Sequence, residues 1–180
     1  MPIPLRLLAR LRCERGVSLV ELVVVLAIMG IVLASLTTLF VRGNKVGIDL
    51  GVRFQAQSGV RVAVDRLRRD VRCAKAVSGG ATSVTLTLPA TCGGGGSVSW
   101  CTVASGSHWG LYRKAAATCD ASGVLWADYV STASVFSVYA QSPTSLGRLA
   151  VDLRVNALPQ APRDAFELQD TIVLRNSARS

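Results

Sequence analysis

The chain has 180 residues, half of them apolar, and a formal net charge of +9 at pH 7. Much of the apolar content lies before Phe40, while the rest keeps enough aliphatic and aromatic residues for one small core. This length and distribution predict a tethered globular domain and exclude a protein with several membrane spans.

The first 16 residues form a basic leader. They contain Arg6, Arg10, Arg12 and Arg15 against a single acid, Glu14. Because positive residues beside a membrane span stay cytoplasmic, we expect the N-terminus inside the cell and the chain after the span outside. Without the leader, 16 basic and 10 acidic side chains remain, a net charge of +6.

Residues 17–42 are predicted to form a membrane-spanning helix. The 19 residues from Leu22 to Phe40 contain no charge and no proline. At the helical rise per residue this run reaches roughly 28 Å, close to the thickness of a bilayer's hydrocarbon core. Glu21 borders the run, and a carboxylate there is costly in lipid, which marks it as a functional residue.

Segment 43–78 is predicted to continue as an amphipathic helix, because apolar residues recur every three or four positions. The stripe consists of Leu50, Phe54, Gln57, Val60, Val64, Leu67, Val71 and Ala74, with Gln57 as its polar exception. Asp65 is spaced to pair with Arg68 or Arg69 on the helix surface. Gly79 and Gly80 signal the end of the helix.

Gly43, Gly47 and Gly51 lie four residues apart where the two helical segments join. Each glycine within a helix costs about 0.5–1 kcal/mol relative to alanine. These residues mark either a weak or bent stretch where the chain leaves the membrane, or a small-residue face for close helix–helix contact.

After Gly80 the apolar period becomes two, which is typical of β-strands. We expect strands at 83–88, 97–103, 109–113, 135–139, 148–155 and 167–174, with a further segment beginning at 124–126. Pro143, Pro159 and Pro162 fall between these strands. A long helix followed by several strands predicts an α+β fold, with the helix packed on an antiparallel sheet in an extracytoplasmic head at 79–180.

The chain has five cysteines: Cys13, Cys73, Cys92, Cys101 and Cys119. Cys13 lies in the leader, so four remain outside the cell, the number expected for two disulfides in an oxidising compartment. Four cysteines allow three connectivities, and sequence proximity favours Cys73–Cys92 with Cys101–Cys119. The single histidine and the absence of CxxC spacing argue against a zinc site, and we expect neither a metal nor a cofactor.

The junction between leader and span reads Gly16-Val17-Ser18-Leu19-Val20-Glu21-Leu22. It resembles the leader motif of type IV prepilins, in which a glycine precedes an apolar residue and a glutamate occupies the fifth mature position. The resemblance implies cleavage after Gly16 by prepilin peptidase and N-methylation of the new terminus at Val17. Val17 departs from the usual phenylalanine at the first mature position.

The resemblance is strongest over residues 15–40. It extends more weakly to Leu67-Arg68-Arg69-Asp70-Val71-Arg72, which is similar to the helix end of J-type minor pseudopilins and W-type minor pilins. It implies a non-enzymatic minor subunit of a type II secretion pseudopilus or a type IV pilus. Such a subunit waits in the cytoplasmic membrane and is assembled, at an inner-membrane platform, with other pilins or pseudopilins into a filament.

Cleavage gives Glu21 a physical role. The new Val17 ammonium and the Glu21 carboxylate lie one helical turn apart, and charges in an apolar environment must be paired or neutralised. In a filament, Glu21 of an incoming subunit would pair with the terminal ammonium of a subunit already in place and so fix the axial register. Alternatively, Glu21 pairs with its own terminus or lies at the headgroup level, where the helix dipole favours it.

Two other hypotheses have less support in the sequence. The net charge of +6 after processing and the tryptophans Trp100, Trp109 and Trp126 would suit a pilus-borne DNA receptor that stacks on bases. Packing of these tryptophans in the core or on the sheet face is the alternative. His108 is the only histidine, and no catalytic triad, nucleotide-binding loop or metal cluster accompanies it, so we expect no enzyme.

Overall fold

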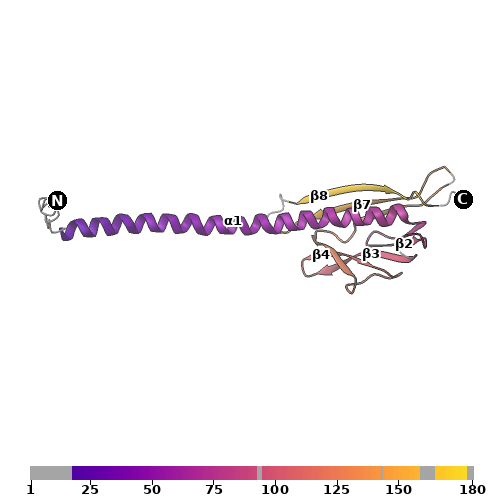
Figure 1. Ribbon diagram of the computed structural model, residues 1–180, viewed down its shortest axis with the longest axis horizontal. Helices are drawn as coiled ribbons and strands as arrows, with labels where there is room; N and C mark the ends of the chain where they lie inside the picture. Colours follow the sequence, from indigo (N-terminus) through magenta and orange to yellow (C-terminus); the bar gives the residue numbers. More distant parts are fainter. Residues whose placement is uncertain (1–17, 93–94, 143, 159–164, 178–180) are drawn as a thin grey trace, which may run out of the picture. The chain divides into compact units, whose positions relative to one another are not determined.

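The computed structural model describes residues 18–92, 95–142, 144–158 and 165–177. The chain divides into two compact units, Met1–Gly47 and Ile48–Ser180. One helix, α1 (Leu19–Cys73), is 55 residues long and runs through Gly43, Gly47 and Gly51 without a break (Figure 1). The boundary between the units therefore falls inside the glycine-spaced stretch.

The second unit contains an antiparallel sheet. Its strands are β1 (Ala76–Gly79), β2 (Ser83–Leu88), β3 (Gly96–Ser105), β4 (His108–Lys114), β5 (Val124–Val130), β6 (Phe136–Tyr139), β7 (Arg148–Val155) and β8 (Phe166–Val173). The order is β1-β2-β3-β4-β5-β7-β6, with β8 on β7. β5 and β7 meet at the single pair Val130–Val155, which lets the sheet curl. This α+β arrangement of a long helix on an antiparallel sheet is the predicted fold.

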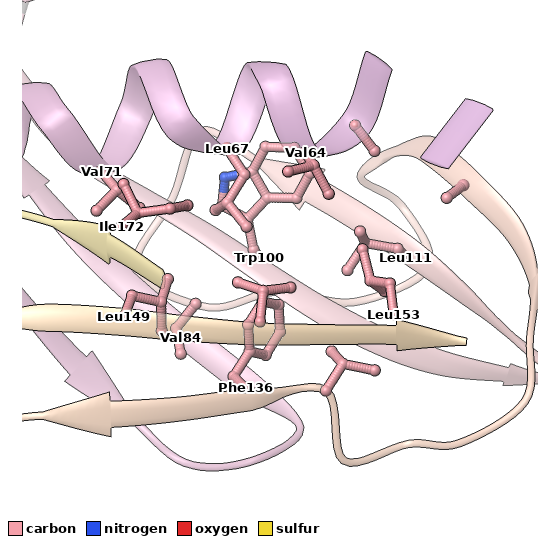
Figure 2. Close-up of a cluster of buried hydrophobic side chains, with 14 of the residues drawn as sticks. Val64, Leu67, Val71, Val84, Trp100, Leu111, Phe136, Leu149, Leu153 and Ile172 are labelled. Carbon is pink, nitrogen blue, oxygen red and sulfur yellow. The ribbon is translucent and has the colours of Figure 1, made fainter. Parts of the chain in front are cut away.

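The core of the second unit lies between the C-terminal part of α1 and the sheet. Trp100 from β3 is fully buried beneath Val64 and Leu67 of the helix (Figure 2). Leu149 and Leu153 of β7 close the same core. Burying a large apolar side chain contributes about 1.5–3 kcal/mol, so these contacts fix the helix to the sheet.

The predicted apolar stripe is buried only in its C-terminal part. Val60, Val64, Leu67, Val71 and Ala74 are at most 1% exposed, as expected. Leu50 and Phe54, in contrast, are 59% and 73% exposed, so the N-terminal part of the stripe is not the sheet-packing face that a continuous apolar stripe suggests. The period of the stripe is helical throughout, but the sheet covers only part of its length.

The predicted helix end near residue 78 was also wrong. α1 ends at Cys73, and Ala76–Gly79 forms β1 instead, in register with β2 from Ala76–Thr87 to Gly79–Val84. Gly79 has a φ of +130°, and Gly80 N donates to Ser83 O at 2.8 Å. The two glycines therefore belong to the turn of the β1–β2 hairpin. A pair of glycines is typical both of such a turn and of a helix end, so the sequence alone does not distinguish the two.

Candidate functional site

Glu21 lies in the first turn of α1 with an exposed side chain. Ser18 precedes the helix, and its carbonyl accepts a hydrogen bond from Leu22 N at 3.1 Å. The N-terminal end of a helix favours a carboxylate through its dipole. Gly16 and Val17, at which cleavage and methylation are expected, lie outside the described residues. The carboxylate is therefore accessible to a partner at the start of the helix.

The part of α1 in the first unit has an apolar, exposed surface. Its large side chains from Leu22 to Val41 are each about half exposed or more. Within the described residues, α1 is the one helix long and apolar enough to cross a membrane. An apolar face of this extent is stable only when lipid or other protein covers it.

Hydroxyl groups within this apolar segment are satisfied by its own backbone. Ser35 Oγ donates to Val32 O at 2.7 Å, and Thr38 Oγ1 donates to Ala34 O at 2.9 Å. Thr37 Oγ1 likewise donates to the carbonyls one turn earlier. The segment therefore enters an apolar environment without an unpaired hydroxyl donor from these three residues.

Two disulfides connect the cysteines of the head. Cys73 pairs with Cys92, and Cys101 pairs with Cys119, with Cα–Cα distances of 6.2 and 5.8 Å. This is the pairing that sequence proximity favours. The first disulfide ties the last residue of α1 to the loop before β3, and the second ties β3 to the segment after β4. The first therefore holds the end of the helix to the sheet, and the second connects segments within the sheet.

We expect no free thiol among these four cysteines in the mature protein. Each disulfide closes a loop of 19 or 18 residues, for which the loop-entropy estimate is about 3 kcal/mol of stabilisation. Alkylation without reductant followed by peptide mapping measures this directly. A sample of the unprocessed chain, which retains Cys13, is the control, and Cys13 should be alkylated there. Alkylation of two or more head cysteines would overturn the pairing.

A buried carboxylate, Asp70, organises the end of α1. It is 5% exposed and accepts a hydrogen bond from Trp100 Nε1 at 3.1 Å. Arg113 of β4 donates to it from Nε at 2.7 Å and from Nη2 at 3.4 Å. Arg66 Nε lies 3.5 Å from Asp70 Oδ1. One carboxylate therefore joins the helix to two neighbouring strands of the sheet.

A second group of charges on α1 is centred on Arg68. Arg68 pairs with Asp65 at 2.8 Å, as its spacing predicts, and with Asp170 of β8 at 2.7 Å. The hydrogen bond with Asp170 raises the pKa of the Arg68 guanidinium, against the opposing effect of partial burial.

Asp120 lies on the surface of the molecule, between β4 and β5. Hydrogen bonds from Lys114 and then Ser122 lower the pKa of Asp120 to about 2.

None of the three tryptophans has a fully exposed ring of the kind that would stack on bases. Trp100 is fully buried, and Trp109 and Trp126 pack against the core as partly buried residues. His108 pairs with Asp128 at 3.0 Å and stacks on Tyr129 at a ring distance of 4.8 Å. Within the described residues, no group of three or more His, Cys, Asp or Glu side chains is arranged to hold a metal.

Comparison with known proteins assigns the N-terminal segment. Residues 11–37 match the family model described as the prokaryotic N-terminal methylation motif. Comparison with curated proteins and with solved structures gives no match for the chain. The matched residues contain Gly16, Val17 and Glu21 and the start of the exposed apolar helix. The chain therefore carries the prokaryotic N-terminal methylation motif, which includes the start of a long helix whose C-terminal part packs on an antiparallel sheet.

Proposed function

We propose that this protein is a minor structural subunit of a type II secretion pseudopilus or a type IV pilus. The observation that carries the proposal is the methylation motif at 11–37, which leads directly into an exposed apolar helix with Glu21 in its first turn. Prepilin peptidase cleaves between Gly16 and Val17, and Val17 is then N-methylated. Residues 17–42 hold the processed protein in the cytoplasmic membrane, with its N-terminus inside and the head outside.

Assembly moves the apolar helix from lipid into a filament of similar helices. In this environment the Glu21 carboxylate of one subunit pairs with the Val17 ammonium of another, because an unpaired charge there would be costly. The apolar surface from Leu22 to Val41 supplies the packing, and the charge pair supplies the axial register. Other pilins or pseudopilins and the inner-membrane assembly platform are the partners of this step.

The shape of the head favours a minor rather than a major subunit. A sheet of eight strands that curls at one residue pair is larger and more irregular than a repeated shaft subunit requires. The tryptophans give the DNA-receptor hypothesis less support than the sequence suggests, because Trp100 is buried and bonded to Asp70 and because Trp109 and Trp126 are partly buried against the core. The other support for this hypothesis is a modest surplus of positive charge, which most often marks a solvated surface.

The experiment is cross-linking of the native membrane protein, followed by affinity purification and mass spectrometry of its neighbours. We expect enrichment of other proteins that begin with the methylation motif, together with a membrane assembly platform. An equally tagged single-span protein without the motif is the control. Co-purified secretin and secreted enzymes would assign the pseudopilus, and a retraction ATPase would assign the pilus. Enrichment no greater than the control's would refute the proposal.

A further inference from the structure

A cavity of about 520 Å³ lies beside the C-terminal end of α1 in the second unit. Arg66, Arg69 and Asp70 of the helix line one side, and Arg113 of β4 lines another. A volume of this size is within the range of small-molecule sites. The cavity is remote in sequence from the N-terminal motif, so the assembly role does not account for it.

The charge around this cavity is unbalanced. Three guanidinium groups border it, and among the described lining residues Asp70 is the one acid, which leaves a local excess of two positive charges. Asp70 Oδ2 accepts hydrogen bonds from Trp100 Nε1 and Arg113 Nε, and Oδ1 lies 3.4 Å from Arg113 Nη2 and 3.5 Å from Arg66 Nε. The carboxylate therefore pairs closely with Arg113 and more loosely with Arg66, and it forms no ion pair with Arg69.

Arg66 has an unsatisfied donor at this place. Its Nε atom is buried and forms no hydrogen bond, since Asp70 Oδ1 at 3.5 Å attracts the charge without hydrogen-bond geometry. Leaving a buried donor unpaired costs about 1–3 kcal/mol. Arg69 is exposed, and no described acidic side chain forms an ion pair with it. Arg69 therefore has no described anionic partner, and Arg66 shares the Asp70 carboxylate with Arg113.

The remaining walls are stiff and partly apolar. The Cys73–Cys92 disulfide forms part of the lining and ties the helix end to the loop before β3. Leu88 and Val98 add apolar surface, and Ser97 adds a hydroxyl. The disulfide and the pairing of β2 with β3 fix this part of the lining, opposite the arginines that α1 and β4 contribute.

We propose that this cavity binds an oxyanion, a phosphate or carboxylate group, through Arg66, Arg69 and Arg113. The planar guanidinium fork matches both kinds of group and forms charge-assisted hydrogen bonds with them. The bound group accepts from the terminal N–H groups of Arg66 and Arg69, and it offsets the local excess of positive charge. The Arg113 N–H groups that do not reach Asp70 complete its coordination.

The test is an NMR titration of the ¹⁵N-labelled full chain in a nonionic detergent at low ionic strength. The probes are inorganic phosphate and N-acetylglutamate, which separate a phosphoryl ligand from a carboxylate ligand. We expect saturable shifts at the Arg66, Arg69 and Ser97 amides, with a millimolar dissociation constant. Arg69→Gln should weaken binding by about tenfold, because one charge-assisted hydrogen-bonding partner is lost.

Arg72→Gln is the matched control, since it removes the same charge from an exposed residue of the same helix that does not line the cavity. It should change the dissociation constant by less than about twofold. Arg66→Gln removes a second guanidinium group from the cavity lining and should weaken binding as Arg69→Gln does. Binding of either probe with this variant pattern supports the site and assigns its ligand class. No saturable binding of either probe, or equal losses in Arg69→Gln and Arg72→Gln, would overturn it.

Discussion

Glu21→Ala is expected to leave leader cleavage intact and to reduce incorporation into filaments by more than about tenfold. Removing one partner of a buried charge pair costs about 3–5 kcal/mol, and each 1.4 kcal/mol corresponds to about tenfold in an equilibrium. In the variant, the Val17 ammonium would enter the filament without an acid to neutralise it. The measurement is the ratio of protein in the sheared filament fraction to protein in the membrane, determined by immunoblotting.

Glu167→Ala is the control for this variant. Glu167 is an exposed carboxylate of β8 that pairs with Arg154 at 3.1 Å, far in sequence from the methylation motif. Its removal lowers the negative charge by the same amount and should leave incorporation unchanged. If Glu21→Ala enters filaments as well as Glu167→Ala does, the role assigned to Glu21 is wrong.

Asp70→Ala is expected to destabilise the head by about 3–5 kcal/mol, the cost of breaking a buried ion pair from one side. Arg113, whose side chain is 18% exposed, and the indole N–H of Trp100 would both lose their acceptor. The measurement is urea unfolding of the full chain in a nonionic detergent, followed by near-ultraviolet circular dichroism of the tryptophans.

Asp65→Ala provides the comparison on the same helix. The Asp65 side chain is 60% exposed, and its partner Arg68 keeps Asp170 when Asp65 is removed. An exposed pair of this kind contributes about 0–1 kcal/mol. Equal unfolding midpoints for the Asp70 and Asp65 variants would show that the buried cluster does not hold the helix to the sheet.

The alternation of apolar and polar residues predicted most strands of the sheet. Ser83–Leu88 and Arg148–Val155 were predicted with the bounds that β2 and β7 have, because alternation over six to eight residues is set by the strand's own period. The N-terminal motif was also readable, since its residues are close in sequence and the family-model match at 11–37 covers them.

Side-chain exposure and the end of α1 depend on residues that are distant in sequence, so the local sequence pattern did not predict them. Leu50 and Phe54 continue the helical stripe, yet no described strand covers them, so their exposure depends on the extent of the sheet. Ala76–Gly79 extends as β1 because β2 offers it a partner, which no local propensity encodes. The helix therefore ends where strand pairing begins.

Asp70 is the clearest case of a residue that the sequence conceals. Several arginines are close to it in the helical sequence, and an acid in this setting is ordinarily interpreted as one partner of an exposed ion pair. Its hydrogen-bonding partners Trp100 and Arg113 lie 30 and 43 residues away in the chain. Only the three-dimensional fold shows that this carboxylate is buried, and that three arginines border one cavity beside it.

The most direct test of the account is the mass of the N-terminal peptide of the native protein, purified from cells that contain prepilin peptidase. The account predicts a chain that begins at Val17, with one methyl group on its terminal nitrogen. A polypeptide that still begins at Met1 in such cells would contradict it, because the charge that Glu21 is proposed to neutralise would then not exist.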